Sequence, residues 1–185
     1  MLGWFAYLWF TPIPAPYQYQ LISEGDSKKF PQMDLDAWPD LKLSQYKVQA
    51  EGIDKPIAEL IVAQQGDGPR VLTYWKNSTN QILYNLDRKP SELSALAAVI
   101  GKHAPKDALI LSWWDTSRQI KLLTGHDTLF NSHLNEPLMV PVAWLEQSKA
   151  IMAYENHFWE SSASSKEQEQ FKRFRDRKST RLNSS

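Results

Sequence analysis

The stretch Ile57-Ala-Glu-Leu-Ile-Val-Ala-Gln-Gln-Gly-Asp-Gly-Pro-Arg-Val-Leu-Thr-Tyr-Trp75 decides the fold of the first half of this chain. Two short apolar runs, Ile57–Ala63 and Val71–Trp75, have the composition of β-strands. Between them, Gln65-Gly-Asp-Gly-Pro69 is typical of a turn. We therefore expect two neighbouring strands joined by a reversal of the chain.

Further strand candidates lie on both sides of this pair. From Tyr17 to Ile22, tyrosine and leucine alternate with other residues in the period of two that predicts a strand. A turn at Glu24–Ser27 and a loop at Pro31–Asp40 follow, and then a strand at Tyr46–Ala50. Another strand is expected at Gln81–Tyr84. The N-terminal half is thus predicted to be an antiparallel meander of short strands.

The pattern changes in the second half to alternating helices and strands. We expect first a helix from Pro90 to Ile100, stopped by Gly101 and Pro105, and then a buried strand at Ala108–Ser112. A helix capped by Asp115 and closed by Gly125 should follow, and then a strand at Asp127–Phe130. A loop at Asn131–Pro137 and a long helix at Val142–Trp159 complete the order. The predicted fold class is therefore α+β or mixed α/β, with a strand-rich antiparallel half followed by helix–strand–helix–strand–helix. Residues 17–160 are expected to form a single globular domain.

The composition excludes several classes of protein. The 185-residue chain carries 21 Lys and Arg against 21 Asp and Glu, and this neutral balance argues against non-specific nucleic-acid binding. Because the chain has no cysteine, it cannot form disulfides, cysteine-ligated zinc or iron–sulfur sites, covalent haem attachments or thiol nucleophiles. Seven glycines without a glycine-rich run leave little room for a phosphate-binding loop.

The N-terminal residues 1–16 differ from the rest of the chain. An apolar run rich in aromatic residues, Met1–Phe10, precedes the proline-rich Thr11–Pro16. As a helix, this run would span about 15 Å, half of a bilayer core, and tryptophan and tyrosine favour the membrane interface. We interpret residues 1–16 as the end of a transmembrane anchor followed by a stiff spacer. The alternative is an amphipathic helix that packs into the domain.

The C-terminal residues also differ from the middle of the chain. Residues 161–177 are first polar and then basic, and we interpret them as a solvated segment. Residues 178–185 resemble a translated sequencing adapter, so we expect a non-native tail there.

One short stretch concentrates groups that could bind a ligand or a partner, at the predicted junction of a strand and a helix. Ligands of α/β folds bind at such junctions, because the first turn of a helix offers free N–H groups. The candidate binding residues are Trp113, Trp114, Asp115, Thr116, Ser117 and Arg118. In the structural alternative, Asp115 caps the helix and pairs with Arg118. The two tryptophans should point to opposite faces, so at most one of them would line a pocket.

Metal and catalytic sites are not predicted. The four histidines, at positions 103, 126, 133 and 157, lack the i, i+4 spacing of a helical metal pair. Ser112 or Ser117 with His126 and Asp127 lacks the Gly-x-Ser-x-Gly turn of a nucleophilic serine. We therefore expect no catalytic residue, no metal and no cofactor.

Four stretches of the sequence form recognisable motifs, namely Trp4–Pro12, Tyr17–Gln20, Leu109–Arg118 and Leu122–Gly125. These motifs resemble the hydroxylamine oxidation protein HaoB family, whose members are encoded beside hydroxylamine oxidoreductase in ammonia oxidisers and methanotrophs. The resemblance implies an accessory protein on the periplasmic side of the inner membrane, partnering hydroxylamine oxidoreductase or another multihaem protein, without enzyme activity. Because family members look longer, it also implies that this chain is truncated at both ends.

Two function classes follow from the sequence. The first is the non-catalytic accessory protein that the resemblance implies. The second is a periplasmic domain that binds a small ligand or a glycan at the stretch from Trp113 to Arg118, which we call the Trp-Trp-Asp corner. A concave pocket lined by Asp115 and Arg118 would favour ligand binding, whereas a flat apolar patch would favour a protein partner.

Overall fold

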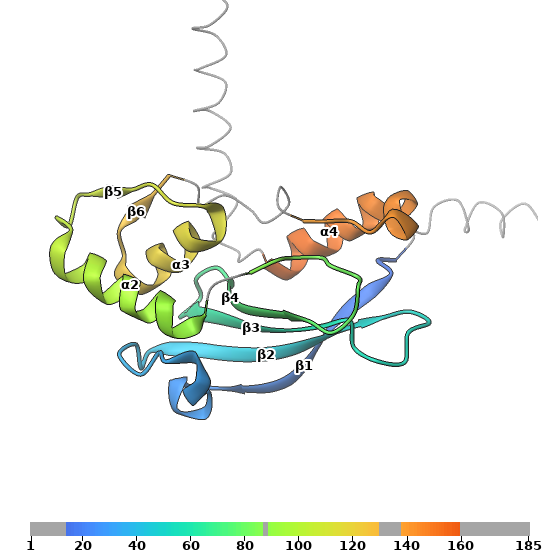
Figure 1. The fold of residues 1–185 in the computed structure, drawn as a ribbon, viewed down its shortest axis with the longest axis horizontal. Coiled ribbons are helices and arrows are strands. Elements are labelled where there is room, and N and C mark those ends of the chain that lie inside the picture. Colours follow the sequence, from blue (N-terminus) through green and yellow to red (C-terminus); the bar gives the residue numbers. More distant parts are fainter. Residues whose placement is uncertain (1–13, 87–88, 130–137, 160–185) are drawn as a thin grey trace, which may run out of the picture.

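The computed structural model describes residues 14–86, 89–129 and 138–159. Its largest element is a four-stranded antiparallel sheet in the order β1-β2-β3-β4 (Figure 1). The strands are β1 (Tyr17–Gly25), β2 (Leu41–Ala50), β3 (Ala58–Gln65) and β4 (Val71–Asn77). The predicted meander is therefore confirmed. Two short 3₁₀ turns, η1 (Ser27–Lys29) and η2 (Pro31–Met33), lie in the predicted loop region between β1 and β2.

The expected strand at Gln81–Tyr84 is wrong. This segment forms no strand, yet Leu83 and Tyr84 are completely buried. Its carbonyl groups accept hydrogen bonds from the amide N–H of Met139 at 3.0 Å and from the side chain of Asn77, the last residue of β4, at 3.2 Å, and not from the backbone of a neighbouring strand. The apolar residues that suggested a strand are therefore buried as a loop across the core.

Three helices follow the sheet, as predicted, with corrected boundaries. They are α2 (Pro90–His103), α3 (Trp114–Thr124) and α4 (Ser148–Trp159), the last preceded by the 3₁₀ helix η3 (Val142–Gln147). Gly101 does not stop α2, which continues to His103. Gly125 does close α3, with a left-handed backbone at φ 73°. The long helix expected over Val142–Trp159 is α-helical only from Ser148.

Apolar side chains cover both faces of the sheet, because alternate residues of a strand point to opposite sides. The cluster between one face and α4 includes Val48, Leu60, Val62, Trp75, Ile151 and Trp159. The cluster on the other face joins the 3₁₀ turns, α2 and the end of α3, and includes Met33, Leu43, Ile61, Leu93 and Leu123. In Figure 1, α2 and α3 lie toward one end of the sheet and α4 toward the other.

The strand expected to be buried at Ala108–Ser112 is exposed. Only Leu109–Ile110 forms a strand, β5, which pairs in parallel with β6 (Asp127–Thr128) in a separate two-stranded sheet. Leu109 is 61% exposed and Leu111 69% exposed. The reason is that β5 does not join the main sheet, so its outer side has no neighbouring layer among the described residues.

Several predicted segments lie outside the described residues. They are the anchor with the first half of its spacer, the loop at Asn131–Pro137, the segment 161–177 and the tail 178–185. Within the described parts of the chain, none of the helices combines the length and the apolar character needed to cross a bilayer.

Candidate functional site

The Trp-Trp-Asp corner lies where the chain leaves β5 and enters α3. Trp113 is the N-cap residue of α3 and is 73% exposed. Trp114 is half-buried and packs on the cluster beneath α4, with its ring 6.3 Å from that of Tyr84. The two tryptophans thus face different environments. The prediction that Asp115 caps the helix is wrong, because the N-cap is Trp113, two residues earlier, and Asp115 lies in the first turn.

The hydroxyl groups of the corner are buried and bonded within it. Ser117 is completely buried, and its Oγ donates to the carbonyl oxygen of Ser112 at 3.0 Å. The N–H of Ser117 donates to the carbonyl of Trp113 at 2.7 Å. Thr116 is also buried, and its Oγ1 donates to Asp115 at 3.3 Å. These bonds fix the path of the chain from β5 into α3.

The next two side chains of α3 bind the outer edge of the main sheet. Gln119 is buried and donates from Nε2 to the carbonyl of Leu72 at 2.8 Å. Arg118 is buried and donates to the carbonyl of Arg70 at 3.0 Å. Because β4 is an edge strand, its outward carbonyl groups need partners other than a further strand. Gln119 supplies one for Leu72 in β4, and Arg118 binds the carbonyl of Arg70 just before the strand, so part of the predicted site has a structural role.

A second cluster of polar groups, around Glu155 of α4, was not found from the sequence. Glu155 is completely buried, and its two carboxylate oxygens accept four hydrogen bonds. Oε1 accepts from the phenols of Tyr17 and Tyr19, the latter at 2.6 Å. Oε2 accepts from Tyr84 at 2.8 Å and from the indole N–H of Trp159 at 2.6 Å. Four donors on two oxygens is the pattern of an ionised carboxylate with its lone pairs occupied.

Aromatic rings surround this carboxylate. The ring of Tyr17 stacks on Trp144 with centroids 5.6 Å apart, and the ring of Tyr19 lies 4.2 Å from that of Phe158. Arg70 lies over the Phe158 ring, with its guanidinium 4.8 Å from the ring centre. The same arginine donates to the carbonyl of Phe158 at 2.7 Å, near the end of α4. Together with the hydrogen bonds to Glu155, these contacts join α4 to β1, to Arg70 just before β4 and to the loop at Tyr84.

The phenols are held in their neutral form. Burial, followed by the negative charge of Glu155, raises the pKa of Tyr17, Tyr19 and Tyr84 well above the usual value near 10. Burial also raises the pKa of Tyr154, whose hydroxyl accepts from the backbone N–H of Tyr19 at 2.7 Å. All of these hydroxyls therefore stay available as neutral groups across the physiological range of pH.

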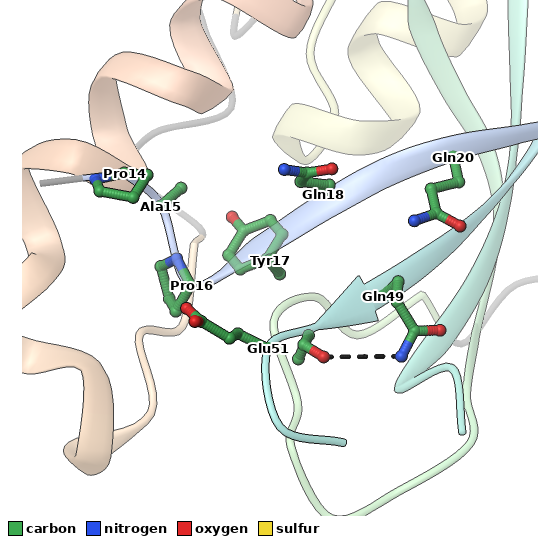
Figure 2. A pocket seen from close by; sticks show the side chains of 9 residues that line it. Pro14, Ala15, Pro16, Tyr17, Gln18, Gln20, Gln49 and Glu51 are labelled. Atoms are coloured by element: carbon green, nitrogen blue, oxygen red, sulfur yellow. Dashed lines mark hydrogen bonds between the residues drawn. The ribbon is translucent and has the colours of Figure 1, made fainter. Parts of the chain in front are cut away.

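An open groove of about 370 Å³ lies at the start of β1 and the end of β2. Figure 2 shows it between the short Pro14–Pro16 segment and the glutamine side chains of the two strands. Its lining residues are Pro14, Ala15, Pro16, Tyr17, Gln18, Gln20, Gln49, Ala50 and Glu51. None of them belongs to the Trp-Trp-Asp corner, so this groove is not the pocket that the ligand-binding hypothesis requires.

The histidines described by the structure have no shared site. His103 lies in the last turn of α2, where a basic residue suits the helix dipole. His126 is buried, with Nε2 3.0 Å from the carbonyl of Pro105 and Nδ1 3.0 Å from the hydroxyl of Thr124. Over the described ranges, no three histidine or carboxylate groups come together as metal ligands would.

The fold and the site define a small α+β domain that is built around a buried carboxylate in an aromatic core. A family model described as HaoA-associated protein HaoB matches residues 1–179. The chain belongs to this family, and the predicted family resemblance is confirmed. The family description associates it with HaoA and hence with hydroxylamine oxidation. No curated protein and no solved structure gives a significant match to the chain.

Proposed function

We propose that this chain is a membrane-anchored, periplasmic accessory protein that binds HaoA and has no catalytic role of its own. The observation that carries the proposal is the match of the HaoA-associated family over residues 1–179. The apolar and aromatic residues 1–10 with the proline-rich stretch behind them support the anchor and the periplasmic location.

The placement of the reactive groups supports a non-catalytic role. Glu155 is completely buried and its oxygens are occupied by four donors, so a substrate has no access to it. Ser117 is likewise completely buried and bonded to Ser112. A general base or a nucleophile must reach the reacting atom, and neither side chain can do so without local unfolding.

The alternative, a ligand- or glycan-binding domain at the Trp-Trp-Asp corner, has less support. Thr116, Ser117 and Arg118 are buried and bonded to neighbouring protein groups. Trp114 packs toward the core, and the groove in Figure 2 lies elsewhere. The exposed group at the corner is an indole, which suits a protein partner better than a hydrogen-bonded sugar pocket.

The test is reconstitution of the full chain with purified HaoA. Biolayer interferometry should give saturable binding, and the chain alone should not consume hydroxylamine. Absence of binding at concentrations up to about 100 μM, where even weak specific complexes form, would refute the accessory role. Turnover of hydroxylamine by the chain alone would refute the non-catalytic role.

The location needs a separate measurement. Alkaline phosphatase, which is active only after export, would be fused behind residue 160 and assayed in intact cells. Active phosphatase that remains in the membrane fraction after carbonate washing is expected. An inactive fusion, or one released by the wash, would refute the periplasmic location or the anchor, respectively.

A further inference from the structure

Four apolar side chains are exposed on the small parallel sheet and at the start of α3. They are Leu109 (61% exposed), Leu111 (69%), Trp113 (73%) and Leu129 (44%), and we call them the β5–β6 strip. Leu109, Leu111 and Trp113 alternate with the half-buried Ile110 and Ser112, so they share one side of an extended segment.

Leu129 directly follows the neighbouring strand, β6. Leu109 lies opposite Asp127 and Ile110 opposite Thr128 in the parallel register. The N–H of Leu129 donates to the carbonyl of Ile110 at 3.1 Å, which continues the pairing by one residue. The next position in register places Leu129 beside Leu111. The strip is therefore a continuous surface that spans both strands.

Exposure of Trp113 sets it apart from the other tryptophans. Of those in the described residues, Trp75 and Trp159 are buried, and Trp38, Trp114 and Trp144 are half-buried. An isolated exposed leucine is ordinary on a protein surface, but a tryptophan flanked by three exposed leucines is an apolar patch. Tryptophan is also the residue most enriched among the side chains that dominate binding energy in interfaces.

The strip is held rigid before any partner binds. The buried ring of His126 bridges Thr124 at the end of α3 and Pro105 before β5, with both contacts at 3.0 Å. At the other end, Ser117 fixes Ser112 and Trp113 through the hydrogen bonds described above. A surface that is already ordered loses little conformational entropy on association.

We propose that the β5–β6 strip is the surface through which this chain docks on HaoA. The proposal rests on the proposed function, because the family description supplies the partner. The matching surface of HaoA would be an apolar patch into which Trp113 inserts, with the three leucines closing around it to exclude water.

The charges around the strip favour a protein over a lipid surface. Lys106 and Asp107 precede β5, Asp127 begins β6, and all three are exposed. Anionic membranes attract clusters of basic residues, whereas the rim of a protein interface carries both signs. The mixed rim therefore points to a folded protein partner.

The experiment compares two strip variants with a matched control in the full chain. Leu111→Ser and Trp113→Ser remove apolar surface from the strip, and serine at position 113 is also a favourable N-cap for α3. Ile22→Ser removes an apolar side chain of similar exposure, 50%, from edge strand β1. Each strip variant should weaken the affinity for HaoA about tenfold or more, and Ile22→Ser less than about twofold. Equal urea midpoints would show that the fold is retained.

The outcomes distinguish a failure of the proposed docking surface from a failure of the proposed function. If the wild type binds HaoA and the strip variants bind equally well, the strip is not the interface, although the accessory function stands. If the wild type does not bind HaoA, the proposed function fails and the strip loses its partner. Light scattering tests a second copy of the chain as occupant. A wild-type dimer that Trp113→Ser converts to a monomer would overturn the proposal. It would also be overturned if the strip variants lost binding to lipid vesicles but kept binding to HaoA.

Discussion

Tyr17 and Glu155 are 138 residues apart in the sequence, and the phenol of Tyr17 donates a hydrogen bond to the carboxylate of Glu155 in the core. Tyr17 is the first residue of the sheet and Glu155 lies in the last described helix. Because Tyr19, Tyr84 and Trp159 donate to the same carboxylate, one buried group connects both ends of the domain. A buried carboxylate is tolerated when its oxygens are fully hydrogen-bonded, as they are here.

Replacing Glu155 by glutamine should destabilise the domain by about 1–3 kcal/mol. The amide keeps one oxygen but places an NH₂ group against two of the four donors. Because the indole N–H of Trp159 can only donate, the amide must turn its oxygen toward Trp159 and Tyr84. Its NH₂ group then faces Tyr17 and Tyr19, whose hydroxyls must rotate to accept, so charge-assisted hydrogen bonds are replaced by weaker neutral ones. Urea denaturation followed by tryptophan fluorescence measures the loss.

The matched control is Glu146→Gln in η3, where the side chain is exposed. It should change the free energy of unfolding by less than about 0.5 kcal/mol. Equal stability of Glu155→Gln and wild type would contradict the role assigned to the four hydrogen bonds.

The raised pKa values of Tyr17, Tyr19 and Tyr84 predict a loss of stability at alkaline pH. In the folded state these phenols keep their protons above pH 10, whereas unfolded tyrosines release theirs near pH 10. The folded state then binds more protons, so the free energy of unfolding is unaffected below the unfolded pKa and falls as the pH rises above it.

Urea midpoints at pH 8 to 11.5, together with absorbance at 295 nm, test this dependence. We expect the buried tyrosines to ionise together with unfolding. Tyr17→Phe should make the decline between pH 10 and 11.5 shallower. Ionisation of every tyrosine near pH 10 in a chain that stays folded would refute the prediction.

Gln119 should be essential as a donor to the sheet edge. Gln119→Glu keeps the shape of the side chain but turns an acceptor toward the carbonyl of Leu72, which now accepts from Gln119 at 2.8 Å. We expect a loss of about 3 kcal/mol or more, and about 1–3 kcal/mol for Gln119→Met, which only leaves the carbonyl without its partner. The exposed Gln20→Glu is the control and should be nearly neutral. In thermal or chemical denaturation, the decisive result is a larger loss of stability for Gln119→Glu than for Gln119→Met.

Two glycines near helix ends should respond to alanine with opposite signs. Gly101 lies inside α2 with no atom within 4 Å of an added Cβ, so Gly101→Ala should stabilise the domain by about 0.5–1 kcal/mol. Gly125 has a φ of 73° at the end of α3, so Gly125→Ala should cost about 1 kcal/mol. Differential scanning calorimetry would show the two melting temperatures moving apart. A shift in the same direction for both variants would contradict the helix boundaries.

The sequence by itself determined the features that depend on neighbouring residues. The alternation at Tyr17–Ile22 and the glycine turn before Val71 predicted the antiparallel strands, and Gly125 marked the end of α3. These signals are local, since strand periodicity and left-handed turns are set by sterics within a few residues. The motifs that resemble the HaoB family could also be recognised from the sequence, and the family model that matches residues 1–179 agrees with them.

The Trp-Trp-Asp corner shows where local signals became insufficient. Periodicity separated Trp113 from Trp114, but it did not indicate which of the two would be exposed. The apolar pattern at Ala108–Ser112 suggested a buried strand, but the strand that forms there, β5, exposes the apolar side chains of its outer side. Whether an apolar strand is buried depends on which layer packs against it, and no neighbouring residue carries that information.

Only the tertiary structure decided the role of Glu155. In the sequence it is one acidic residue in a helix that also carries polar side chains, and such a residue is normally solvated. Its four donors come from β1, from the loop at Tyr84 and from one turn further along α4. The stability of a buried charge depends on groups that folding brings within 3 Å of it, and those groups are separated by up to 138 residues of chain.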